Sequence, residues 1–333
     1  MTPRELIKYF KAAQWKDEQD IQAFVQQMGA VDKKAVAQML DVLCNKRASS
    51  ELHLHALRLR VFAKFADRVE DKTLFVNYVQ ALKNGDSRVR QAIIPILPKV
   101  NNFQEHAKLC ALLKSPDAGT RHAAVEAIKK VGAPATGQII AKMLMDKDFK
   151  GRKEAMDLVV TMSGHNSVRA LGAVLNFGTV DEKLAALKYL GDSRYMAKGP
   201  TVALKAILAA FEDKTDKVVV QAINSFTELA GEDAFFEYVE PFFESPKIEI
   251  VKASIAGLSK YKTVRGISTL ERKLRAGPAE VRTEVLNALE KIGTDDVLPT
   301  LVEALGHKQV AVRNQAAEIL QSLSQAGKID VAR

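Results

Sequence analysis

Cysteine, tryptophan and long apolar runs are scarce in this sequence, and each scarcity excludes a class of protein. The only two cysteines, Cys44 and Cys110, lie far apart in apolar segments, so a disulfide framework is excluded and buried free thiols are expected. No apolar run approaches the roughly 18 residues that a membrane-spanning helix needs. The first residues lack the apolar core of a signal peptide. Together these features favour a reducing, cytoplasmic location.

Catalytic motifs are also missing. The sequence has no Gly-x-Ser-x-Gly nucleophile elbow, no His-Glu-x-x-His zinc motif and no phosphate-binding loop ending in Gly-Lys. Among the six histidines, only His53 and His55 are close, and an i, i+2 spacing points two side chains to different sides of a helix. We therefore expect no catalytic residue, no metal site and no cofactor.

The positive charge is confined to one half of the chain. The net charge is +9, and residues 1–165 hold 27 of the 49 Lys and Arg but only 18 of the 40 Asp and Glu. Residues 166–333 hold 22 of each. Such an asymmetry favours an acidic partner, including nucleic acid, although a lysine-rich solvated surface gives the same count.

What the sequence has in abundance is self-similarity with a period of 31 residues. A basic residue, here called the marker, recurs at Arg90, Arg121, Arg152 and Lys183, and again at Arg282 and Arg313. Val220 and Val251 hold the equivalent places between these two runs. Only the step from Lys183 to Val220 is longer, by six residues. A fixed period of this length indicates a repeat architecture.

The apolar residues keep a constant phase within each repeat. With a few lapses they stand three, seven and ten residues after the marker, on one face of a helix. Each marker therefore predicts the start of a helix of about 14 residues, and a second amphipathic run predicts a partner helix. Predicted N-caps are Asp86, Asp117, Asp148 and Asp216. Predicted helix stops in the left-handed conformation are Gly132, Gly164, Gly191, Gly231 and Gly293.

These segments resemble the HEAT repeat, in the short form also seen in phycobilisome-lyase-like HEAT proteins. The resemblance rests on Asp-x-x-Val-Arg-x-x-Ala-like segments at 86–93, 117–124, 278–285 and 309–316, and it covers residues 73–324. It implies an all-α fold, a right-handed α-solenoid (superhelix) of stacked helical hairpins. It also implies a ladder between repeats formed by Asp86, Arg90, Asp117, Arg121, Asp148 and Arg152. Val220, Lys247, Val251 and Pro278 depart from the pattern, so the ladder is expected to break in the middle.

The period divides the chain into five segments. Residues 1–72 fall outside the register but predict helices at 3–14, 18–28, 33–45 and 51–65, with a capping box formed by Thr2 and Glu5. They form an N-terminal helical cap or atypical repeats, or alternatively a small separate domain. The remaining segments are four basic repeats at 73–193, an insertion loop at 194–199, four neutral repeats at 200–324 and a tail at 325–333.

The polar positions of the marker helices are the candidate binding surface. In HEAT solenoids the second helix of each hairpin lines the concave side, and here its polar positions in the basic half predict a cationic stripe. Its members are Arg88, Gln91, Lys99, His122, Lys129, Lys130, Lys150 and Lys153. Lysine near a helix C-terminus is also favoured by the helix dipole alone. The insertion is either a contact loop with Arg194, Tyr195 and Lys198, or a tolerated lengthening.

The sequence favours a non-catalytic scaffold that binds an acidic protein or peptide on its concave face. Nucleic-acid binding is the alternative, because bacterial alkyl-purine DNA glycosylases are similar in fold and basicity. Those enzymes need aromatic side chains in the groove, whereas the single tryptophan here, Trp15, lies in the N-terminal segment. Bilin lyases of the related HEAT class are a third hypothesis. The sequence identifies neither the partner nor the oligomeric state.

Overall fold

The computed structural model describes residues 2–29, 31–45, 51–66, 72–98, 103–132, 134–162, 165–192 and 200–330. Contacts divide the chain into two compact units, Met1–Ala170 and Leu171–Arg333, and the division falls inside α12 (His165–Phe177). Every regular element in the described residues is a helix. No helix in these ranges combines the length and apolarity needed to cross a bilayer.

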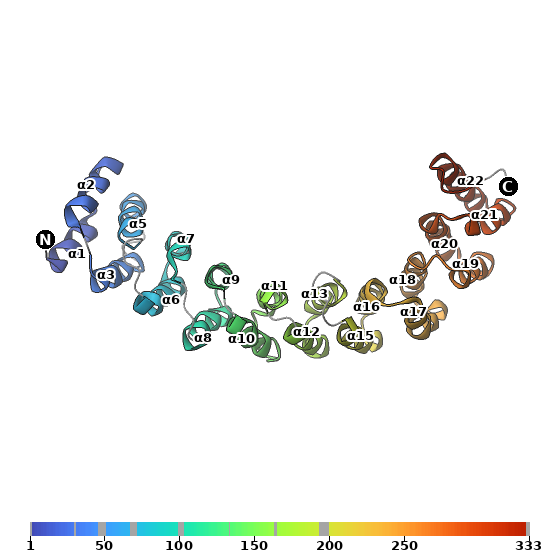
Figure 1. The fold of residues 1–333 in the computed structure, drawn as a ribbon, viewed down its shortest axis with the longest axis horizontal. Helices are drawn as coiled ribbons and strands as arrows, with labels where there is room; N and C mark the ends of the chain where they lie inside the picture. The colour runs from blue at the N-terminus through green and yellow to red at the C-terminus, as the bar shows by residue number, and fades with distance from the viewer. Residues whose placement is uncertain are drawn as a thin grey trace. The chain divides into compact units, whose positions relative to one another are not determined.

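Two layers of helices build the N-terminal unit (Figure 1). Each helix contacts the next one of its own layer. The first layer holds α3 (Lys33–Leu43), α6 (Phe75–Asn84), α8 (Phe103–Ala111) and α10 (Pro134–Leu144). The second holds α5 (Leu52–Ala66), α7 (Ser87–Ile93), α9 (Ala118–Val131) and α11 (Arg152–Met162). The unit also contains α1 (Pro3–Ala12), α2 (Glu18–Met28) and the short 3-10 helices η1 (Lys72–Leu74), η2 (Ile94–Ile96) and η3 (Leu112–Lys114).

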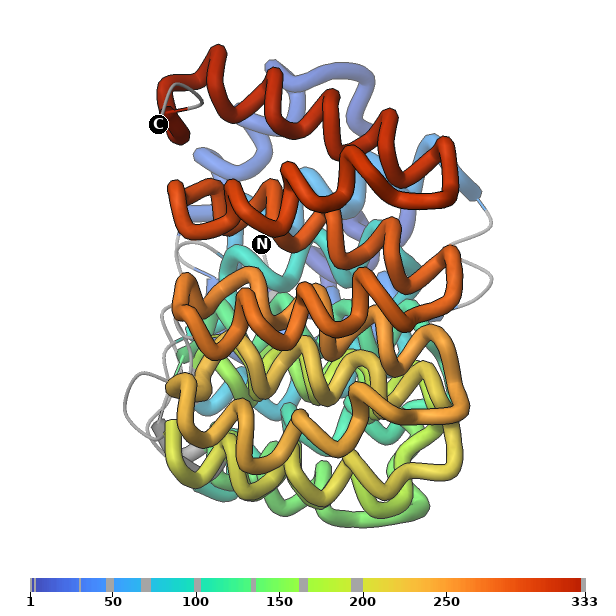
Figure 2. Tube along the Cα trace, turned by 90° about the vertical axis from the view of Figure 1, so that its right-hand side faces the viewer, coloured from blue at the N-terminus to red at the C-terminus, as the bar shows by residue number. Residues whose placement is uncertain are grey.

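The C-terminal unit repeats this arrangement. Its successive marker helices contact one another, and Figure 2 shows the yellow to red helices of this unit stacked roughly side by side. They are α13 (Val180–Gly191), α16 (Asp216–Leu229), α18 (Ile248–Leu258), α20 (Ala279–Ile292) and α22 (Val310–Gln325). Their partners are α15 (Pro200–Leu208), α17 (Glu232–Val239), α19 (Val264–Ala276) and α21 (Leu298–Leu305), with η4 (Ala209–Glu212), η5 (Glu240–Glu244) and η6 (Asp295–Val297).

Both units confirm the predicted all-α solenoid of helical hairpins. The helices that carry the markers form one layer of each unit, here called the marker layer. The apolar positions three, seven and ten residues after the marker are buried, as Ala124, Ile128 and Val131 show in α9. Stacking one hairpin on the next thus buries, within each unit, an apolar core that no single hairpin can enclose.

Many helix ends lie where local sequence signals predicted them. Thr2 and Glu5 form the predicted capping box, and Asp86 and Asp117 cap α7 and α9. Gly132 and Gly293 have the predicted positive φ, +50° and +55°. The four helices predicted before residue 72 are found within two residues of their expected bounds, as α1, α2, α3 and α5. Their role as a cap stays a prediction, as does the division of the chain at 194–199.

Other predicted helix ends were wrong. Asp148 caps no helix, because α11 begins only at Arg152, and Asp216 is the first residue of α16 rather than its N-cap. Gly191 and Gly231 have no positive φ, and Gly164 lies outside the described residues. The helix of Arg90 is also shorter than predicted. It ends at Ile93 and continues as η2, because Pro95 has no N–H and its ring clashes with a helical backbone.

Candidate protein-binding surface

Three residues of the predicted stripe stand one position after the marker on neighbouring helices of the N-terminal unit. They are Gln91 on α7, His122 on α9 and Lys153 on α11, and all three are exposed. Packed helices lie about 8–10 Å apart. The three side chains therefore form a row that crosses the marker layer.

The other described stripe residues lie at both ends of these helices. Arg88 and Lys150 each stand two positions before a marker, and Arg88 is tied to its own N-cap residue by a 2.6 Å ion pair with Asp86. Lys129 and Lys130 stand in the last turn of α9, about 11 Å from His122 at 1.5 Å per residue. Lys129 pairs with Glu126 at 3.0 Å.

Three lysines of the stripe are free to meet a partner. Lys130, Lys150 and Lys153 are exposed, and within the described ranges none of them forms an ion pair. Four predicted contact residues lie outside the described residues: Lys99, Arg194, Tyr195 and Lys198. From here on the described members, Arg88, Gln91, His122, Lys129, Lys130, Lys150 and Lys153, are called the N-terminal stripe. Their role in binding stays a prediction.

A buried histidine, His55, lies next to Asp86, the N-cap residue of α7. The Asp86 carboxylate accepts from the N–H of Val89, pairs with Arg88, and lies 3.5 Å from Nε2 of His55. Burial raises the pKa of Asp86, but the hydrogen bonds from Val89 and Arg88 outweigh it and hold the pKa below its ordinary value. His55 is 0% exposed, and neither ring nitrogen has a well-formed hydrogen bond within the described residues. Burial lowers the pKa of His55, while the Asp86 carboxylate opposes that shift.

The His55 environment predicts a loss of stability in mild acid. Because the pKa of His55 is lower in the folded chain than the 6.5 of a free imidazole, the unfolded chain takes up its proton first as the pH falls. The stabilisation is therefore complete above pH 6.5 and decreases below it. We expect His55→Leu to flatten the fall in the free energy of unfolding as the pH decreases below 6.5. Urea unfolding at several pH values measures this slope.

A second histidine on the same helix provides the control. His53 is exposed on α5, so His53→Leu should leave the slope of the unaltered protein unchanged. If His55→Leu kept the full slope, the acid sensitivity would have another source.

The ladder implied by the HEAT resemblance is present in part. Arg90 pairs with Asp117 at 2.8 Å, as implied, and also donates to the carbonyl of Leu82 at 3.0 Å. Arg121 pairs with Glu154 at 2.7 Å instead of Asp148. The late start of α11 leaves Asp148 in the preceding turn and brings Glu154, in the first turn of that helix, to Arg121.

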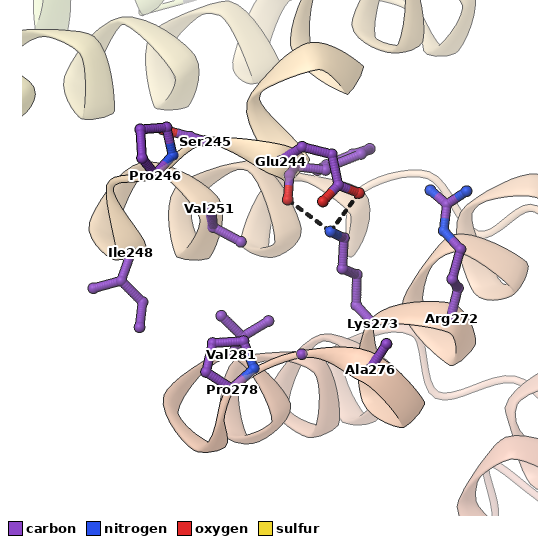
Figure 3. Close-up of a pocket in the computed structure, with 12 residues that line it drawn as sticks. Glu244, Ser245, Pro246, Ile248, Val251, Arg272, Lys273, Ala276, Pro278 and Val281 are labelled. Carbon is purple, nitrogen blue, oxygen red and sulfur yellow. Dashed lines mark hydrogen bonds and ion pairs between the residues drawn. The ribbon is translucent and has the colours of Figure 1, made fainter.

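In the C-terminal unit, lysines also join neighbouring repeats. Lys183 pairs with Asp213 at 2.6 Å, and Lys260 caps the last carbonyls of α16, including that of Glu228 at 2.8 Å. Lys273 of α19 donates to the carbonyl of Phe243 at 2.8 Å and pairs with Glu244 at 2.6 Å (Figure 3). Sequence reasoning missed Lys273, which has no fixed place in the period. These lysines serve structural contacts, unlike Lys130, Lys150 and Lys153.

The described residues show no metal site, because no cluster of three or more His, Cys, Asp and Glu among them is placed to hold an ion. The surface offers cationic and hydrogen-bonding side chains on a regular framework.

Comparison with known proteins supports the fold. A model described as HEAT repeats matches residues 77–158 and 267–333. No curated protein matches this chain. The similar solved structures include the karyopherin Kap121p, whose fold is of the same class.

Three structures of the karyopherin Kap121p are similar in fold. Its complex with Nup53p has a TM-score of 0.58 and 15% identity over 96% of this chain and 41% of Kap121p. Its complex with Ste12p has a TM-score of 0.58 and 14% identity over 97% and 42%. Its complex with the extreme C-terminus of the protein phosphatase Cdc14p has a TM-score of 0.57 and 16% identity over 97% and 42%. This chain thus spans less than half the length of Kap121p.

Proposed function

Because this chain carries HEAT repeats, we propose that it is a non-catalytic cytoplasmic scaffold that binds an acidic protein or peptide on the concave side of its marker layer. The observation that supports this most directly is the set of exposed lysines that form no ion pair within the described residues, Lys130, Lys150 and Lys153. The complexes of Kap121p with Nup53p, Ste12p and the Cdc14p C-terminus support protein binding as a use of this fold.

The spacing of the marker helices suggests the form of the partner. A polyproline II segment has three residues per turn and a rise of about 3.1 Å per residue, so residues i and i+3 project from one side about 9 Å apart. Neighbouring helices of the marker layer are separated by about the same distance. An acidic residue at every third position would therefore meet successive helices of the N-terminal stripe. A single exposed ion pair contributes only about 0–1 kcal/mol, so affinity depends on several acting together.

We expect charge reversal in the stripe to weaken binding of such a segment at least tenfold. The probe is a fluorescein-labelled peptide with glutamate at every third position, followed by anisotropy at about 50 and 200 mM salt. Lys130→Glu with Lys153→Glu replaces two attractions by two repulsions, which lowers both the affinity and its salt dependence.

Two lysines of the C-terminal unit provide a matched control. Lys205 and Lys262 are exposed, and the same double reversal there, Lys205→Glu with Lys262→Glu, should change the affinity far less. Equal losses from both pairs would mean that only net charge matters. Tighter binding of duplex DNA than of the peptide at the higher salt would replace the protein-scaffold proposal by the nucleic-acid alternative.

A further inference from the structure

The row of marker cations is interrupted at Val220 and Val251. In the repeats of Arg90 and Arg282 the marker arginine donates to the carbonyl eight residues before it and to a side chain 27 residues after it. Arg282, for example, bonds to the carbonyl of Leu274 at 2.9 Å and to Gln309 at 2.8 Å. At Val251 the carbonyl eight residues earlier belongs to Phe243, and Lys273 occupies it (Figure 3). A lysine from another helix thus replaces the missing arginine there.

At Val220 the missing arginine leaves a hollow of about 760 Å³ between α13, α16 and α18. Its floor is apolar, formed by Leu184, Val220 and Ile248, which are each half-buried, together with Pro246. The volume lies within the range of about 300–1,000 Å³ that ligand sites occupy. We call this hollow the Val220 pocket.

The Val220 pocket belongs to the same helix face as the N-terminal stripe. Leu184 and Gln221 line it, and each stands one residue after its marker position. Gln91, His122 and Lys153 hold that position in the N-terminal unit. The same position of the period is therefore polar or cationic at Gln91, His122 and Lys153 in the N-terminal unit and apolar at Leu184 in the C-terminal unit.

The rim of the pocket holds two lysines and two carboxylates, and both carboxylates are paired, which leaves one lysine of the rim without an ion pair among the described residues. Asp216 pairs with Lys247 at 3.5 Å and Glu249 pairs with Lys252 at 3.1 Å. Lys217, also on the rim, forms no ion pair in the described part of the chain. Lys247 moreover stands at the N-cap of α18, which has no side-chain cap, whereas aspartate caps α9. A cation beside the positive end of a helix dipole is unfavourable alone, and a carboxylate relieves it.

A second hollow lies on the other side of the same turn. It has a volume of about 370 Å³ and shares Pro246 and Ile248 with the Val220 pocket. Arg272 lines it, extending from α19 beside Lys273 (Figure 3). The turn at Pro246 thus stands between two hollows, each with a cation at its edge.

We propose that the Val220 pocket anchors an extended acidic segment of a partner protein by taking up its aliphatic side chains. Leucine side chains of the segment pack on Leu184, Val220 and Ile248, and neighbouring carboxylates face Lys217 and the uncapped start of α18. The proposal rests on the proposed function, because the segment is part of the same acidic partner. The N-terminal stripe supplies charge recognition, and the pocket adds selectivity for apolar residues within the acidic sequence.

Two peptides and one repaired repeat test this proposal with the full chain. The first peptide has glutamate at every third position and two leucines between them, and the second has serine in place of leucine. Val220→Arg with Lys247→Asp restores a cation and an aspartate 27 residues apart, the spacing of Arg90 and Asp117. We expect the unaltered protein to bind the leucine peptide at least tenfold more tightly, and the repaired variant to lose this preference.

The controls separate the pocket from charge and from folding. Thr201→Arg with Lys205→Asp makes the same charge change at exposed positions of α15 and should keep the preference for leucine. Thermal unfolding checks the fold of each variant, and Val220→Lys, which copies Lys183, fills the pocket with a single change.

Each contrary result has a distinct meaning. Equal affinities of the unaltered protein for the two peptides, or a preference that survives filling the pocket, overturn the pocket proposal. If both peptides bind equally and Lys130→Glu with Lys153→Glu abolishes that binding, the scaffold proposal stands without the pocket. If neither peptide binds, both proposals are wrong.

Discussion

Replacing Gly191 by valine should destabilise the C-terminal unit more than any other single change considered for this protein. Gly191 is buried at the end of α13, where that helix crosses α16. A Cβ atom at this position would lie 2.7 Å from both Cα and Cβ of Ser225. Real Cβ atoms do not approach backbone so closely, so the two helices must move apart. Overpacking of this kind costs about 1–3 kcal/mol, and the fixed backbone of α16 places this site at the upper end.

Urea unfolding and hydrogen exchange measure the effect. We expect the free energy of unfolding to fall by about 3 kcal/mol and amide protection to be lost first in α13 and α16. In a linear repeat array each repeat contacts only its neighbours. Protection should therefore be affected less in helices farther along the unit, such as α20 and α22.

Gly231 provides a matched control. It precedes α17 with a φ of −78°, and a Cβ atom there would meet nothing within 4 Å. Gly231→Val should change the free energy of unfolding by less than about 0.5 kcal/mol. If both variants lost the same stability, the cause would be the general cost of replacing glycine, and the close crossing of α13 and α16 would not be the reason.

These two glycines show where sequence reasoning stops. Both follow an apolar helical run, so both were interpreted as left-handed helix stops, and neither has a positive φ. Glycine serves either a special backbone conformation or a close approach, and the sequence around it is the same in both cases. Gly293 satisfied the first requirement and Gly191 the second. The positive φ of Gly293 and the closeness of Gly191 to Ser225 distinguish the two cases, and both are seen only in the structure.

The helices themselves could be predicted because their signals are local. The 31-residue period, the apolar phase and the capping box at Thr2 each depend on residues within a few turns of one another. Pro95 was a local signal too, and it should have shortened the predicted helix of Arg90.

The ladder partners and the pocket depend on contacts between repeats, which the spacing alone does not determine. The partner of Arg121 changed from Asp148 to Glu154 because α11 starts late, after a turn in which Gly151 lies directly against the carbonyl of Leu113. Val220 revealed a break in the ladder, but the sequence did not reveal a hollow. The hollow requires Leu184 and Ile248 on two other helices to leave the space unfilled.

Arg90→Met should cause the second large loss of stability, this time in the N-terminal unit. The Arg90 side chain is 14% exposed and joins two repeats, with bonds to the carbonyl of Leu82, the carboxylate of Asp117 at 2.8 Å and the hydroxyl of Thr120 at 2.7 Å. Methionine retains much of the apolar stem but leaves the Leu82 carbonyl without this donor. Loss of a hydrogen bond to a charged group costs about 1.5–3 kcal/mol. We therefore expect urea unfolding to show a fall of about 2–3 kcal/mol in the free energy of unfolding.

Arg88→Met is the control for this substitution, because Arg88 is on the same helix but pairs within its own turn, with Asp86. It should cost less than about 1 kcal/mol, because the partly exposed Arg88–Asp86 pair joins residues of one turn and not two repeats. Equal losses would mean that the bonds from Arg90 to the next repeat add nothing to the stability that an arginine of α7 contributes.

The pKa of Asp117 gives an independent measurement of the same connection. Hydrogen bonds from the side chain and N–H of Thr120, followed by the Arg90 guanidinium, lower the pKa of Asp117 from 3.8 to about 2. Because this pKa is depressed, the stabilisation is present above pH 3.8 and is lost as the pH falls towards 2. Removing Arg90 should raise the pKa of Asp117 but keep it below 3.8, since the bonds from Thr120 remain. An NMR titration in which the pKa did not move would show that Arg90 and Asp117 are not paired in solution.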